Sequence, residues 1–99
     1  RLSKIIESYL KRRKMIGLSE ETKRILKNLF GKRRIGGKHT EEKNCLRWIK
    51  NLEPEKHKLI LKEWQECIKE GFILKEIKTG EFHVSLNPRK LKEIHEIID

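Results

Sequence analysis

The segment of residues 59–86 constrains the fold more than any other, because a helical pattern ends there in a glycine and two strand patterns follow at once. In its first half, apolar residues recur every three or four positions, which predicts an amphipathic helix with one buried stripe. Gly71 then stands where a left-handed residue ends a helix without a Cβ penalty. The predicted stripe consists of Ile60, Leu61, Trp64, Cys67 and Ile68.

A β-hairpin is expected directly after Gly71. A short apolar run, residues 72–74, begins the first strand, and apolar and polar residues alternate over residues 81–86. Such alternation predicts a strand that is buried on one face only. The Thr79-Gly80 pair between the strands fits a tight turn. The residues expected to face inward in the second strand are Phe82, Val84 and Leu86.

Five helices in all are predicted from apolar stripes and from residues that start helices, and the helix described above is the fourth of them. The first lies within residues 1–17, and the others are expected to start at an N-cap or at a proline in the first turn. The third and fourth helices are separated only by the bend at residues 51–53, and two helices joined by so short a turn form a helix-turn-helix pair. The start signals are Ser19 for the second helix, Thr40 for the third, Pro54 for the fourth and Asn87-Pro88 for the last.

The end of the fourth helix and the start of the hairpin resemble the winged helix-turn-helix superfamily. A leucine, an aromatic residue three positions on, Cys67-Ile68 and then the run of residues 69–73 resemble the end of a recognition helix and the first wing strand of small prokaryotic regulators. Residues 37–40 and 83–88 resemble motifs of small archaeal winged-helix proteins of unassigned role. The alternative is an unrelated fold with a helix before a hairpin.

The resemblance covers about the last two thirds of the chain and implies an α+β fold. Its centre would be three helices with a β-hairpin wing, extended by an N-terminal and a C-terminal helix. We therefore expect a basic helical extension over residues 1–17 and a winged helix-turn-helix domain over residues 18–99.

Charge is distributed unevenly along the chain. Residues 1–40 carry a net charge of +10, whereas residues 41–99 are neutral. An excess of Lys and Arg on one part of a chain favours a polyanionic partner, since each cation can neutralise a phosphate. The alternative is solvated surface charge in a chain of which 40% is charged. The candidate phosphate contacts are Lys11, Arg12, Arg13 and Lys14 in the first basic run, and Lys32, Arg33, Arg34, Lys38 and His39 in a glycine-rich loop.

The fourth helix, residues 54–70, is the candidate recognition helix. Cationic residues crowd its first half, which is the half that contacts bases in helix-turn-helix proteins. Its second half is rich in Glu, so a protein partner there is the alternative to DNA. At the tip of the wing, Lys78 is a further phosphate contact. The residues expected to face a groove are Lys56, His57, Lys58 and Lys62.

The leading hypothesis is therefore binding of duplex DNA, as a transcription regulator or as a DNA-associated accessory protein. The runner-up is a protein-interaction module in a nucleic-acid-processing assembly. Enzymatic activity is not expected, because no nucleophile motif and no phosphate loop ending in Lys-Ser/Thr is present. Residues 36–40 either place an anion at the start of the third helix or only cap that helix.

No cofactor and no metal are expected. Cys45 and Cys67 are predicted to be reduced, buried and apolar in role, with a disulfide or a metal site as the alternative.

The chain has no apolar run long enough to span a membrane and nothing that resembles a signal peptide, so we expect a cytoplasmic protein. Apolar stripes in the first and last helices predict a homodimer, or else simply cover the central helices.

Overall fold

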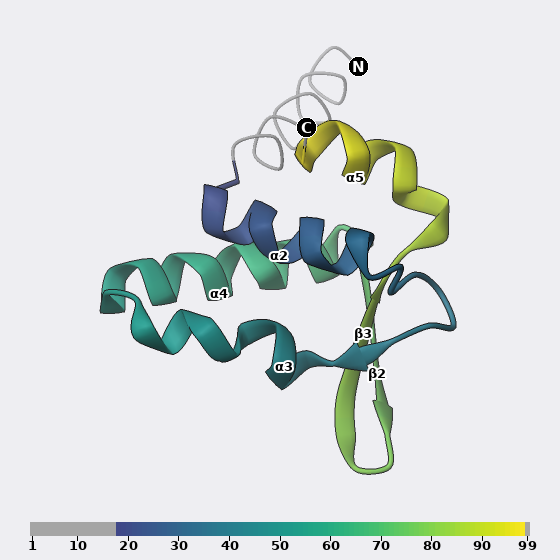
Figure 1. Cartoon of the computed structure of the whole chain (residues 1–99), viewed down its shortest axis with the longest axis horizontal. Coiled ribbons are helices and arrows are strands. Elements are labelled where there is room, and N and C mark those ends of the chain that lie inside the picture. Colours follow the sequence, from purple (N-terminus) through teal and green to yellow (C-terminus); the bar gives the residue numbers. More distant parts are fainter. Residues whose placement is uncertain (1–17, 99) are drawn as a thin grey trace, which may run out of the picture.

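The computed structural model describes residues 18–98 and has an α+β architecture. The predicted first helix and the basic run Lys11, Arg12, Arg13 and Lys14 lie outside the described residues. The order of the elements, with a hairpin after the helices, is compatible with a winged helix (Figure 1). In chain order the elements are α2 (Glu20–Gly31), β1 (Thr40–Glu41), α3 (Glu42–Leu46), the 3-10 helix η1 (Arg47–Asn51), α4 (Pro54–Lys69), β2 (Ile73–Lys78), β3 (Glu81–Leu86), the 3-10 helix η2 (Pro88–Lys90) and α5 (Leu91–Ile98).

Most of the helix ends lie where local signals predict them. The Ser19 hydroxyl caps α2 by accepting from the backbone N–H of Thr22, and Pro54 occupies the first turn of α4. Gly71 follows α4 with a φ of 82°, a left-handed conformation that costs a residue without a Cβ little. Asn87 caps η2, which leads directly into α5.

The third helix departs from the prediction. Thr40 does not cap a helix, because Thr40 and Glu41 form β1 and pair with β3 opposite Val84 and His83. Helix α3 begins only at Glu42, without a side-chain cap, and continues as η1. The partners of β1 lie far later in the chain, so no local signal marks this strand.

The sheet has the order β1-β3-β2, and β2 and β3 form an antiparallel hairpin. Thr79 and Gly80 at its tip both have positive φ, 50° and 81°, as a type I′ turn requires. The prediction that β3 is buried on one face only is wrong at two positions. Phe82 is 48% exposed because the outer half of the hairpin stands clear of the helices, whereas Ser85 in the inner half is buried (Figure 1).

One apolar core joins the helices to the sheet. Trp64 lies at its centre and is fully buried, as predicted, but Leu61 is 36% exposed. The stripe of α5 packs within the chain, next to α2, so α5 offers less apolar surface for self-association than expected. The homodimer stays a prediction. The buried apolar residues are Leu18, Ile25, Leu26, Leu29, Ile49, Ile60, Trp64, Cys67, Ile73, Val84, Leu86, Ile94, Ile97 and Ile98.

Candidate nucleic-acid interface

Helix α4 is fixed to the start of α2 by a buried carboxylate. Oε1 of Glu63 accepts hydrogen bonds from the hydroxyls of Ser19, at 2.6 Å, and Thr22, at 2.7 Å. Its Oε2 accepts from the backbone N–H of Ser19 at 3.0 Å. A negative charge at the N-terminal end of a helix is stabilised by the unpaired backbone N–H groups there. Glu63 therefore forms part of the buried contact between α4 and α2, and is not part of an acidic outer surface as the sequence suggested.

A second carboxylate joins the hairpin to α3 and α4. Oε2 of Glu42 accepts from Nε1 of Trp64 at 2.8 Å and lies 3.0 Å from Nζ of Lys75. The Lys75 ammonium also lies 4.3 Å from the ring centroid of Phe82. These contacts set the direction in which the hairpin leaves the body, and they engage Lys75 inside the protein.

The outer face of α4 carries a stripe of four long polar side chains. Lys58, Lys62, Gln65 and Lys69 are all exposed, and their spacing of four, three and four residues keeps them on one face of a helix. This face lies opposite the buried Ile60, Trp64 and Cys67. The three lysines form no ion pair with other residues of the 18–98 segment. We call Lys58, Lys62, Gln65 and Lys69 the α4 stripe.

The structure divides the four residues predicted to face a groove. Lys58 and Lys62 belong to the α4 stripe. Lys56 instead points toward α2, where its Nζ lies 3.3 Å from Oε1 of Glu21, and His57 is half-buried. Sequence reasoning missed Gln65 and Lys69, although the same three-and-four spacing, continued from Lys62, identifies both.

The tip of the hairpin is accessible but nearly neutral. Lys78 is exposed, and its Nζ lies 3.9 Å from Oε1 of Glu76. On the other strand Glu81 pairs with Lys43 at 3.4 Å. Hydrogen bonds to Glu81 and then to Glu41 raise the pKa of Lys43, so this ammonium stays charged. The electrostatic contribution of the hairpin to a polyanion contact is therefore small.

Two large apolar side chains lie on the exposed part of the hairpin. Ile77 and Phe82 face each other across the strands and are 65% and 48% exposed. They continue the inner face of the sheet beyond the body of the protein, because the register places Ile77 and Phe82 on the same face as the buried pair Ile73 and Leu86.

The glycine-rich loop after α2 is held by backbone hydrogen bonds to the end of β3. Leu86 donates to the carbonyl of Arg34 at 2.8 Å and accepts from the N–H of Gly36 at 3.0 Å. Arg33, with a φ of 54°, and Lys38 are exposed, whereas Arg34 is half-buried. Lys32 is exposed as well, so the loop presents three of its cations to solvent and only Arg34 is partly covered.

Residues 36–40 do not stand at a helix N-terminus, where they were predicted either to place an anion or to cap the third helix. The strand β1 intervenes before α3, and the acidic Glu41 stands at the position before that short helix. Nδ1 of His39 lies 2.8 Å from Nδ1 of His83, so one of the two rings donates to the other. His39 is therefore engaged with β3.

Both cysteines are free thiols. Cys67 is buried in the core, and burial, followed by the charges of Glu63 and Glu66, raises its pKa to about 12. Cys45 is half-buried, and burial raises its pKa to about 11. Protonated thiols of this kind are poor nucleophiles, because the thiolate is the reactive form.

Comparisons of the chain with family models, with curated proteins and with solved structures find no match. Between residues 18 and 98, no three His, Cys, Asp or Glu side chains are grouped so that they could hold a metal ion. None of the helices in this part of the chain has the length and apolar character needed to cross a membrane.

Proposed function

We propose that this chain binds double-stranded DNA, with α4 in the major groove and the β2–β3 hairpin beside it as a wing. The observation that carries the proposal is the α4 stripe, whose three lysines are exposed and form no ion pair with other described residues. Helix α4 also follows a short turn and precedes a hairpin, which is the order of elements in a winged helix.

The dimensions of the α4 stripe suit a duplex. From Lys58 to Lys69 a helix rises about 16 Å, at about 1.5 Å per residue. That length corresponds to about five base pairs at about 3.4 Å each. The lysines can contact phosphates or guanine edges, and an exposed glutamine such as Gln65 can pair with adenine in the major groove.

The charge of the exposed face favours DNA more than the sequence suggested. Over residues 54–70, four glutamates balance four lysines. In the structure Glu63 is buried against Ser19 and Thr22, and Glu66 is half-buried, so the solvent-facing side of the helix is predominantly positive. In the loop after α2, Arg33 and Lys38 extend the set of exposed cations, and Lys78 adds one at the wing tip.

A protein-interaction role is the second candidate, and a different surface favours it. In the Glu-rich half of this helix Glu63 is buried, which leaves the half-buried Glu66 and Glu70 for the partner contact that was predicted there. The exposed pair Ile77 and Phe82 on the hairpin is instead the apolar surface that a protein partner would cover.

Affinity for duplex DNA, followed by fluorescence anisotropy over a range of salt concentrations, tests the proposal. The variant Lys58→Ala/Lys62→Ala/Lys69→Ala should bind at least about tenfold more weakly, because phosphate contacts dominate affinity. The slope of log affinity against log salt should become shallower by about 0.9 for each phosphate that the variant no longer neutralises, or about 2.7 for three phosphates.

A matched control removes the same charge from other exposed positions. Lys27→Ala/Arg89→Ala/Lys92→Ala changes three exposed cations on α2, η2 and α5. This variant should keep nearly all of the affinity and of the slope. Equal losses in the two variants would show that only net charge matters, and would refute α4 as the DNA-contacting helix.

A further inference from the structure

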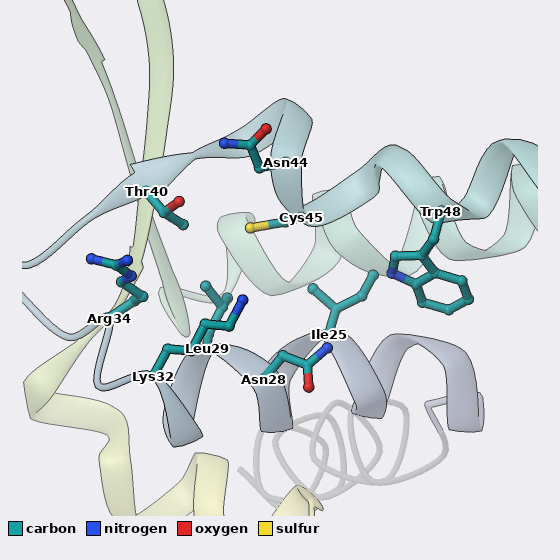
Figure 2. A pocket seen from close by; sticks show the side chains of 9 residues that line it. All are labelled: Ile25, Asn28, Leu29, Lys32, Arg34, Thr40, Asn44, Cys45 and Trp48. Atoms are coloured by element: carbon teal, nitrogen blue, oxygen red, sulfur yellow. The ribbon is translucent and has the colours of Figure 1, made fainter.

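A small cavity lies between α2 and the chain that runs from β1 to η1 (Figure 2). Its volume is about 110 Å³. Apolar side chains of Ile25 and Leu29 line it from α2, and Cys45 and Trp48 line it from the opposite side. None of these four residues belongs to the α4 stripe, so the cavity is separate from the proposed DNA contact.

The polar lining of the cavity is cationic or neutral throughout. Lys32 and Arg34 contribute two positive charges, and Asn28, Thr40 and Asn44 contribute amide and hydroxyl groups. No carboxylate is among the lining residues. In Figure 2, Lys32, Arg34 and Thr40 gather at one end of the cavity and Trp48 lies at the other.

Arg34 holds an unused donor in this region. Its Nε is buried and has no hydrogen-bond partner among the described residues. A buried guanidinium donor without an acceptor is costly, because it has lost its hydration and gained nothing in return. Because a water-sized group does not reach Nε, a ligand in the cavity would meet the terminal nitrogens of this guanidinium, which make no hydrogen bond or ion pair among the described residues.

No negative charge from the protein opposes such a ligand. Burial raises the pKa of the Cys45 thiol to about 11, although Lys32 and Arg34 act in the opposite direction, so the sulfur is neutral at physiological pH. Glu42 is the acidic residue that acts on Cys45, and its Oε2 is already bound by Trp64 and Lys75.

We propose that this cavity binds a phosphate group, held by Lys32 and Arg34 with help from the amides of Asn28 and Asn44. A guanidinium and an ammonium together match the charge and the hydrogen-bonding geometry of phosphate. The size agrees, because a protein cavity of about 150 Å³ takes a benzene ring. A cavity of about 110 Å³ therefore admits a compact five-atom group.

Two sources present this chemistry, a small phosphorylated molecule and the phosphate backbone of a nucleic acid. The binding of free phosphate does not depend on the DNA proposal, since the residues involved are different.

The test is a titration of the full chain with inorganic phosphate at constant ionic strength, with chloride replaced by phosphate. Binding is followed by amide chemical shifts of residues 28–48 and by the rise in melting temperature. We expect saturable shifts in this segment. Lys32→Gln and Arg34→Gln should each weaken binding tenfold or more.

Arg33→Gln is the matched control, because Arg33 carries the same charge in the same loop but is exposed and does not line the cavity. This variant should bind phosphate as the parent does. Should Arg34→Gln fold poorly, Lys32→Gln still decides the question, because Lys32 is exposed and contributes nothing to the core. A response that never saturates, or equal losses in Arg33→Gln and Lys32→Gln, would overturn the proposal.

Competition with duplex DNA separates the two sources. If duplex displaces inorganic phosphate and Arg34→Gln also weakens DNA binding, the cavity holds a backbone phosphate. If both bind at once, the cavity holds a small phosphorylated molecule. The α4 stripe variant should lose DNA binding and still bind inorganic phosphate. That result would show that the two proposals can be tested independently of each other.

Discussion

At the scale of single residues, Glu63 contributes more to the packing of the helices than its position in a run of charges suggests. It is 9% exposed and accepts three hydrogen bonds from Ser19 and Thr22. The sequence pattern places Glu63 among the exposed acids of α4, because its partners are more than forty residues away and leave no local trace. The structure shows that this glutamate connects two helices.

We predict that Glu63→Ala lowers the free energy of unfolding by about 2–4 kcal/mol, because the substitution leaves buried donors without an acceptor. Urea denaturation measures the change. Glu66→Ala is the control, since Glu66 lies one turn away in the same helix and is half-buried. Its cost should stay below about 1 kcal/mol. Similar losses in both variants would contradict the role given to the Glu63 hydrogen bonds.

The two thiols make stability depend on pH in the alkaline range. In the unfolded chain a thiol ionises at an ordinary pKa of about 8.5, whereas burial raises the folded-state pKa of Cys45 to about 11 and of Cys67 to about 12. Between these values the folded chain binds more protons than the unfolded chain, so stability falls as pH rises. Below pH of about 8 the thiols add no pH dependence.

We therefore expect the free energy of unfolding to fall between pH of about 9 and about 11. Cys67→Ala should show a smaller fall than the parent, even though its stability at neutral pH is lower. Urea denaturation at several pH values gives both curves. An identical pH dependence in the variant would show that ionisation of Cys67 does not contribute.

At the scale of elements, local signals located most helix ends. Ser19, Pro54, Gly71 and Asn87 each act through their own backbone or their nearest neighbours, so sequence alone identifies them. Strand β1 was missed because a two-residue strand exists only through its pairing with β3. The same reason explains the site: Lys58 and Lys62 were predicted because they lie in the first half of the helix, whereas the pairing of Lys56 with the distant Glu21 was not predictable.

The ion pair of Glu42 and Lys75 should stabilise the contact between the hairpin and the body of the protein. Their side chains are 16% and 23% exposed, so solvent screens this pair less than a surface pair. A double-mutant cycle with Glu42→Gln and Lys75→Met should give a coupling free energy of about 1 kcal/mol. The cycle with Glu76→Gln and Lys78→Met, an exposed pair in the same hairpin, should give nearly zero. Equal coupling in the two cycles would contradict a special role for the Glu42 and Lys75 pair.

At the scale of the whole molecule, net charge alone does not identify the face that meets a polyanion. The formal charge is +10, and all of it arises in the first 40 residues. In the described part, however, Lys32 and Arg34 line a cavity and Lys56 is paired. The α4 stripe lies in the electrically neutral part of the sequence, yet this face is positive because it carries Lys58, Lys62 and Lys69 while Glu63 is buried elsewhere on the helix.

The most direct test of the central claim is NMR mapping of the full chain during titration with duplex DNA. We predict that the largest changes occur in the α4 stripe, at Lys58, Lys62, Gln65 and Lys69, with smaller changes at the hairpin tip near Lys78. Residues of α5 should remain unaffected. Changes confined to α5 or to the apolar pair Ile77 and Phe82, with the stripe unmoved, would contradict the proposal that α4 enters the groove.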